Sequence, residues 1–157
     1  MRFDPLHIAP GDAEREIMRL AKTQRRATIE PGREIEIATH YDGPDLVETA
    51  ERSKLSVEEL IAAHSGRVYR AFFLGFLPGF AYCGVLDPRI QAPRLVRPRE
   101  RVPAGSVAIA DGQTSIYPFD SPGGWRLIGR TDLRMFDATR EPPALIRPGD
   151  RVRFVAS

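Results

Sequence analysis

The 157-residue sequence carries 23 Lys and Arg against 21 Asp and Glu, a net charge of +2, and 42% of it is hydrophobic. This suits one well-cored soluble domain with a small appendage. The sequence has no run of basic residues that could follow a nucleic-acid backbone and no apolar segment long enough to span a membrane. Its single cysteine, Cys83, excludes an intramolecular disulfide and a cysteine zinc site. We therefore expect a cytoplasmic protein with neither nucleic-acid nor membrane partners.

Residues 1–33 are typical of a fragment of an α/β unit. Residues 1–5 predict the end of a strand, and Asp12 after a Pro-Gly pair predicts a helix N-cap. This helix should fade over 24–26. One strand and one helix cannot bury their own apolar faces. We expect 1–33 to be the remnant of an N-terminal α/β domain and 34–157 to be the main domain.

The next stretch predicts one strand and two helices. Residues 34–39 alternate apolar and polar side chains, as a half-buried strand does. Pro44 suits the first turn of a helix. Ser56 with Glu59 forms a capping box that predicts a second helix, ending near Gly66.

The most unusual stretch is an apolar strand followed by a loop rich in aromatic residues, glycine and proline. Residues 68–74 predict the strand, and we expect a loop from 75 to 88. Pro78-Gly79 is a strong turn signal inside it. The rings of this loop either plug the end of a barrel or face a ligand or partner, and the sequence leaves both open.

The remainder of the chain predicts short strands joined by tight turns. Prolines make 88–103 extended. Strands are expected at 106–110, 114–117, 125–128 and 152–154, with a hairpin turn at Asp111-Gly112 and a compact glycine loop at 121–124. We therefore predict a mainly-β fold: from about residue 67 a closed or nearly closed barrel, with the helices of 44–65 packed against one opening.

The sequence identifies no catalytic residues. Cys83 and His64 lie in no motif for nucleophilic catalysis, and a histidine at a helix end most often meets the dipole or a carbonyl. The three histidines have no metal-ligand spacing, so we predict no metal site. The glycine loop lacks the Lys-Ser/Thr ending of a P-loop.

We expect the aromatic loop and the 113–125 segment to converge on one face. Stacking rings with amide, hydroxyl and guanidinium groups suit a small carboxylate or amide ligand, or the docking of a partner protein. The alternative is that the rings only fill the barrel. The residues predicted for substrate binding or a subunit interface are Phe76, Pro78, Gly79, Phe80, Tyr82, Gln113, Tyr117, Ser121, Gly123, Gly124, Trp125 and Arg130.

Four blocks of the sequence, at 73–82, 101–110, 113–131 and 140–154, resemble one family in order and spacing. It is the family of the B subunit of 5-oxoprolinase, also known as allophanate hydrolase subunit 1, which includes the sporulation-kinase inhibitor and part of urea carboxylase. The resemblance covers 34–157. It implies a cyclophilin-like β-barrel, preceded in full-length members by a small α/β domain. This chain would be a shortened form of such a member.

The resemblance also implies a function. In the family, this subunit pairs with a second cyclophilin-like subunit and a third subunit, and the complex opens 5-oxoproline to glutamate with ATP hydrolysis. We therefore expect a subunit that is inactive alone and supplies part of a shared ATP site. The alternatives are a regulator that binds and inhibits a histidine kinase, and a component of a urea carboxylase or allophanate-processing system. A peptidyl-prolyl isomerase is disfavoured, because no cyclophilin active-site motif is present.

Overall fold

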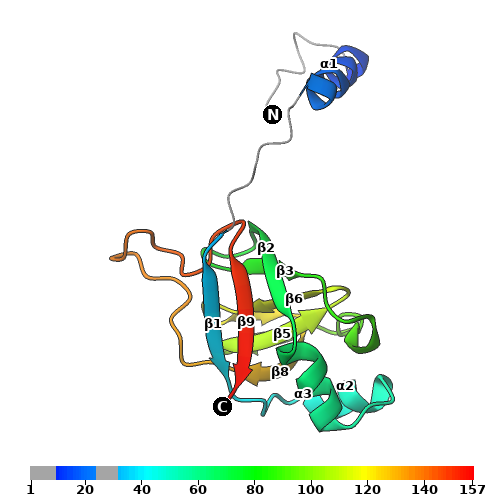
Figure 1. Cartoon of the computed structure of the whole chain (residues 1–157), viewed down its shortest axis with the longest axis vertical. Helices are drawn as coiled ribbons and strands as arrows, with labels where there is room; N and C mark the ends of the chain where they lie inside the picture. The colour runs from blue at the N-terminus through cyan, green and yellow to red at the C-terminus, as the bar shows by residue number, and fades with distance from the viewer. Residues whose placement is uncertain (1–9, 24–31) are drawn as a thin grey trace. The chain divides into compact units, whose positions relative to one another are not determined.

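A computed structural model describes residues 10–23 and 32–157 and divides the chain into two compact units, Met1–Glu30 and Pro31–Ser157. The first contains helix α1, Pro10–Thr23 (Figure 1). Because α1 begins at Pro10, Asp12 lies in its first turn, where it pairs with Arg15, and is not its N-cap. The strand expected at 1–5 and the fading of the helix at 24–26 lie outside the described residues.

The second unit is built on one seven-stranded sheet, in the order β1–β9–β2–β3–β6–β5–β8. The pairing of β1 with β9 is parallel, and the other neighbours run antiparallel. The strands are β1 (Glu34–Thr39), β2 (Val68–Leu74), β3 (Ala81–Gly84), β5 (Ser106–Ala110), β6 (Gln113–Ile116), β8 (Arg126–Arg130) and β9 (Arg151–Ala156).

The two ends of this sheet meet at one backbone bridge. His40 follows β1, and Arg130 ends β8. Each N–H donates to the other's carbonyl, at 2.9 Å from His40 and 2.8 Å from Arg130. The sheet is therefore a nearly closed barrel, and the predicted mainly-β barrel fold is confirmed.

Two short helices, α2 (Leu46–Arg52) and α3 (Val57–Ser65), lie together at one end of the barrel (Figure 1). Helix α2 packs on β8, and α3 packs on β9. The predicted capping box is present, with Ser56 and Glu59 bonded reciprocally at the start of α3. Helix α2 starts later than predicted, because Pro44 lies in a turn ahead of the N-cap residue Asp45.

Two predicted loops contain strands. Residues Ala81–Gly84, assigned to the aromatic loop, form β3 in the middle of the sheet, between β2 and β6. The glycine loop contains β7 (Ser121–Gly123), which pairs with β4 (Arg99–Val102) in a small second sheet. Both strands are too short for periodicity to identify them, and each is defined by its pairing with other strands: β3 with β2 and β6, and β7 with β4. Residues 88–103, which were predicted to be extended, also contain a short 3-10 helix, η1 (Pro88–Ile90).

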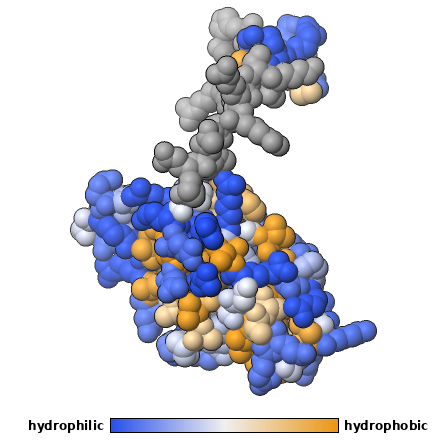
Figure 2. Space-filling view, viewed as in Figure 1, coloured by the Kyte–Doolittle hydropathy of each residue, from blue (hydrophilic) through white to orange (hydrophobic). Residues whose placement is uncertain are grey.

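The core of the second unit has two clusters of buried apolar side chains. The larger one includes Ile37, Ile109 and Phe154, and the smaller one surrounds Phe80 and Trp125. Apolar side chains also reach the surface in several places among hydrophilic ones, on the face shown in Figure 2. In the part of the chain that the structure describes, no helix has the length and apolar character needed to cross a membrane.

Candidate functional site

The aromatic loop between β2 and β3 is held by two consecutive tight turns. The N–H of Leu77 donates to the Gly75 carbonyl at 2.8 Å, and Phe76 between them has a φ of 68°. This is the strained form of the γ-turn, rare for a bulky residue. The N–H of Phe80 then donates to the Leu77 carbonyl at 3.0 Å, with Gly79 at φ 83° as a type II turn requires. The turns fix the backbone at Phe76, whose side chain is 60% exposed.

Phe80 is the centre of a group of aromatic rings brought together from both predicted segments. Its centroid lies 5.0 Å from Tyr82, 5.2 Å from Tyr117 and 5.5 Å from Trp125, with the rings edge to face. Phe76 adds a further edge at 5.4 Å. Phe80, Tyr117 and Trp125 are buried, so the interpretation that the rings fill the interior describes these three correctly.

These rings also form the wall of an open cleft of about 230 Å³, which we name the aromatic cleft. The two predicted segments therefore do meet. Seven of the predicted site residues line it, together with Arg94, Pro98 and Pro122. The seven are Phe76, Phe80, Tyr82, Tyr117, Gly123, Gly124 and Trp125.

Arg94 is the charged residue of this lining, and no sequence motif pointed to it. Its guanidinium carbon lies 5.8 Å from the centroid of Trp125, a cation–π contact. Its Nε is 3.5 Å from a carboxylate oxygen of Asp111, and both side chains are more than half exposed. Arg94 lies in a proline-rich stretch read as a connector, and only the fold brings it over the ring.

Tyr117 places a hydroxyl at the lining of the cleft. A Cβ built on Gly123 would lie only 2.2 Å from that hydroxyl, so the absence of a side chain at Gly123 gives it room. Burial raises the pKa of Tyr117, while a backbone hydrogen bond from Trp125 and the positive charges of Arg94 and Arg99 act in the opposite direction. The hydroxyl therefore stays protonated at neutral pH.

The remaining predicted site residues lie away from this lining. Pro78 and Gly79 line a separate surface hollow. Gln113 is half-buried in β6, Ser121 is buried in β7, and Arg130 lies at the closure of the barrel. A functional role for all twelve predicted residues stays a prediction.

Cys83 and His64 lie inside the protein. Cys83 is 1% exposed, and burial raises the pKa of its thiol to about 12, so it holds little of the nucleophilic thiolate. His64 points into the core and does not interact with a helix-end carbonyl as expected; its ring contacts Tyr41 and Thr114. Within residues 10–23 and 32–157, no group of three or more His, Cys, Asp or Glu is placed to hold a metal ion.

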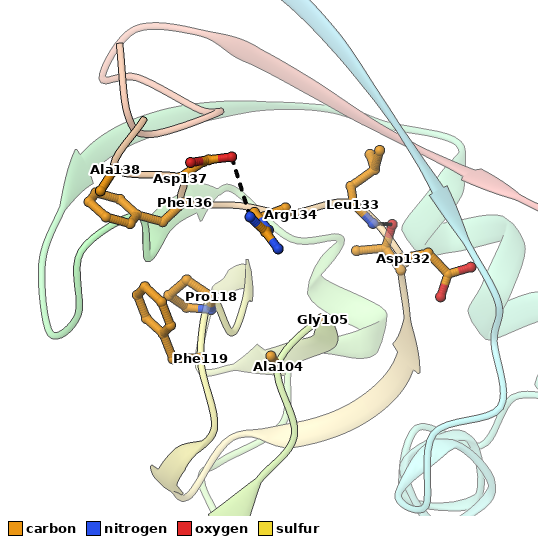
Figure 3. A pocket seen from close by; sticks show the side chains of 11 residues that line it. Ala104, Gly105, Pro118, Phe119, Asp132, Leu133, Arg134, Phe136, Asp137 and Ala138 are labelled. Carbon is orange, nitrogen blue, oxygen red and sulfur yellow. Dashed lines mark hydrogen bonds and ion pairs between the residues drawn. The ribbon is translucent and has the colours of Figure 1, made fainter. Parts of the chain in front are cut away.

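A second cleft, of about 630 Å³, lies between the 131–138 segment and the turns at 104–105 and 118–119 (Figure 3). Arg134 extends into it and forms an ion pair with Asp137 at 3.4 Å. None of the residues that the sequence predicted for a site lines this larger cleft. The aromatic cleft is therefore the candidate site at which the sequence prediction and a cleft of the structure coincide.

A family model described as "Carboxyltransferase domain, subdomain C and D" matches residues 1–146. The chain belongs to this family. Among its curated relatives, the 5-oxoprolinase B subunit of Escherichia coli O157:H7 is 49% identical over 131 residues, 81% of this chain and 60% of the relative. The protein of that name from Bacillus subtilis is 48% identical over 124 residues, 77% of this chain and 52% of the relative. The chain thus spans about half to three fifths of these relatives, and the family resemblance seen in the sequence is confirmed.

Solved structures of other proteins agree with the fold. A conserved uncharacterized protein from Pyrococcus horikoshii, PH0987, is 46% identical with a TM-score of 0.77, over 99% of this chain and 72% of that one. The urea carboxylase of Kluyveromyces lactis has a TM-score of 0.72 at 18% identity, over 99% of this chain and 17% of that one, a likeness of fold alone.

Proposed function

We propose that this chain is a non-autonomous subunit of an ATP-dependent complex that opens the lactam of 5-oxoproline to glutamate. Relatives named as the B subunit of 5-oxoprolinase, at 44–49% identity, support the assignment. The structural observation that carries it is the aromatic cleft, where rings, a hydroxyl and a guanidinium meet. Such a lining suits a small, flat, polar substrate.

The chemistry accounts for the need for several subunits. A lactam amide resists water, and transfer of a phosphoryl group from ATP to its oxygen makes the ring carbon a better electrophile. Water then attacks that carbon and the C–N bond breaks, which frees the amine and leaves an acyl phosphate. A second water hydrolyses the acyl phosphate to the side-chain carboxylate of glutamate and inorganic phosphate. We assign to this chain a share in holding the substrate. ATP would be held at the level of the complex, with a second cyclophilin-like subunit and a third subunit as the partners.

Reconstitution tests this function. The chain is combined with its co-expressed partner subunits, and phosphate and glutamate are measured after addition of 5-oxoproline and ATP. The complete complex should form both products, and the 157-residue chain alone should form neither. Turnover by the chain alone, or a complete complex inert toward 5-oxoproline, would refute the proposal.

A matched pair of variants locates the activity. Phe76→Ser alters the exposed ring of the aromatic cleft, and Phe119→Ser alters a ring that is 40% exposed in the larger cleft. The first should lower turnover by about tenfold or more, whereas the second should leave it within about twofold. The reverse result would move the functional site to the larger cleft.

One further relative favours a second candidate function. The urea amidolyase of Lachancea kluyveri is 33% identical over 99 residues, 55% of this chain and 5% of the relative. A role in processing allophanate is therefore the alternative. Allophanate offered to the same complex in place of 5-oxoproline separates the two functions. If the complex forms product from allophanate and none from 5-oxoproline, the alternative function is the correct one.

A further inference from the structure

We propose that the aromatic cleft binds a small carboxylate whose neighbouring amide is planar, and that Arg94 anchors the carboxylate. This inference rests on the proposed function for the choice of ligand, but the binding itself is a property of this chain. It assigns a specificity-determining role to Arg94.

The charges around the cleft favour an anion. Arg94 is the charged residue of the lining, which contains no carboxylate. Its contact with Asp111 is long, at 3.5 Å, and exposed to solvent, and pairs of this kind contribute little. The guanidinium can therefore exchange this contact for a ligand carboxylate, to which its fork of N–H groups donates two parallel hydrogen bonds.

The contact of Arg94 with Trp125 holds the guanidinium near the mouth of the cleft. The carbon of the guanidinium lies 5.8 Å from the ring centroid, and Trp125 is buried and fixed against Phe80 at 5.5 Å. A side chain that rests on a rigid ring loses less conformational freedom when a ligand arrives. Arg94 is therefore positioned before binding.

The remaining walls suit a small planar ring. The volume of 230 Å³ lies below the roughly 300–1,000 Å³ of clefts that hold drug-sized ligands. Tyr82, half-buried, and Phe76 present aromatic surface, and the buried Tyr117 lies beside them in the lining. A five-membered lactam with one carboxylate matches this combination of flat apolar walls and one cation.

The single tryptophan makes binding directly measurable. Because Trp125 lines the cleft, its fluorescence reports the cleft alone. The full chain is titrated with 5-oxoproline and, separately, with 2-pyrrolidinone, which has the same ring without the carboxylate. 5-Oxoproline should change the emission saturably, and 2-pyrrolidinone should bind at least about tenfold more weakly.

Variants test the anchor. Arg94→Gln should weaken 5-oxoproline binding by about tenfold or more, and Arg94→Lys should recover part of the loss, because the charge remains without the fork. Arg97→Gln is the matched control: it removes an equal charge from an exposed residue outside the lining, and should stay within about twofold of the parent. Melting temperatures close to that of the parent chain would verify that each variant is folded.

The possible outcomes separate this inference from the proposed function. No saturable signal from the parent chain, equal affinity for the two ligands, or an unchanged affinity in Arg94→Gln would overturn the inference, even if the complete complex turns over 5-oxoproline. Carboxylate binding that depends on Arg94, in a chain whose complex leaves 5-oxoproline intact, would support the cleft and refute the proposed function.

Discussion

Two adjacent glycines in the aromatic cleft have different surroundings. A Cβ on Gly123 would meet the hydroxyl and the ring of Tyr117 at 2.2 and 2.8 Å, whereas a Cβ on Gly124 would find Pro98 at an ordinary 3.6 Å. Tyr117 is 1% exposed and packs edge to face against Phe80, so its ring can shift only by disturbing the rings around it. Only Gly123 is required by packing.

Substitution of these glycines should therefore give unequal losses of stability. We expect Gly123→Ala to lower the free energy of unfolding by about 1–3 kcal/mol, because overpacking displaces Tyr117. Gly124→Ala, the matched control, should stay within about 0.5 kcal/mol. Urea denaturation of the two variants measures the difference, and equal losses would show that the Tyr117 contact does not limit what fits at Gly123.

Among the residues of the aromatic cleft, the sequence could predict the aromatic ones but not Arg94. Phe76, Phe80 and Trp125 stand out because glycine or proline lies close to each. No local feature of the sequence marks Arg94. It is singled out by its contact with Trp125, 31 positions later in the sequence, whose ring centroid lies 5.8 Å from the guanidinium carbon. Long-range proximity of this kind is set by the tertiary fold.

Among the elements, those with strong local signals were predicted correctly. The capping box at Ser56 starts α3, and Asp111, with a φ of 55°, lies in the hairpin turn that joins β5 to β6. Strands β3 and β7 were missed because a strand of three or four residues has almost no period of its own. What defines them is hydrogen bonding to β2 and β6 in one case and to β4 in the other.

Helix α2 is tied to both sheets through one carboxylate. Asp45, at the N-cap position, makes no side-chain bond to its own helix. It accepts instead from the Leu127 N–H of β8 at 2.6 Å and from Arg99 of β4 at 2.6 Å. Asp45 is buried, so these two bonds replace its hydration.

Removal of this carboxylate should weaken the attachment of α2 to the sheets. We expect Asp45→Ala to reduce the free energy of unfolding by about 3–5 kcal/mol, the usual effect of breaking a buried ion pair, or somewhat less because Arg99 is partly exposed. Asp42→Ala is the matched control. Its pair with Arg130, at 2.8 Å, is about half exposed on both sides and should contribute at most about 1 kcal/mol. Similar losses in the two variants would contradict the role given to Asp45.

For the molecule as a whole, a hydrogen-bonded chain through the core joins α3 to the barrel wall. Thr114 donates its hydroxyl proton to the Ala108 carbonyl at 3.1 Å, so it accepts from Nε2 of His64 at 2.9 Å. Nδ1 of His64 is then unprotonated and accepts from the Tyr41 hydroxyl at 2.7 Å. The imidazole is neutral, and both its nitrogens are satisfied.

This neutral histidine should make the fold sensitive to acid. Burial lowers the pKa of His64 from 6.5 to about 3. Below pH 6.5 the unfolded chain therefore binds a proton at this residue, whereas the folded chain does not. The free energy of unfolding consequently decreases as the pH is lowered. The loss from this residue should reach on the order of 2 kcal/mol between neutral pH and pH 5. Urea denaturation at both values measures it. His64→Asn, less stable at neutral pH, should show a shallower decline, and an equally steep one would rule out His64 as the cause.

The parallel pairing of β1 with β9 bears on how the chain folds as it is synthesised. The N–H of Arg33, just before β1, bonds to the carboxylate of Asp150, 117 positions later, and β9 is also the neighbour of β2. At about 5–20 residues per second, a ribosome leaves β1 without that partner for roughly 6 to 23 s. The barrel can form only after its last strand has emerged, which makes it a fold of high contact order that completes late and all at once.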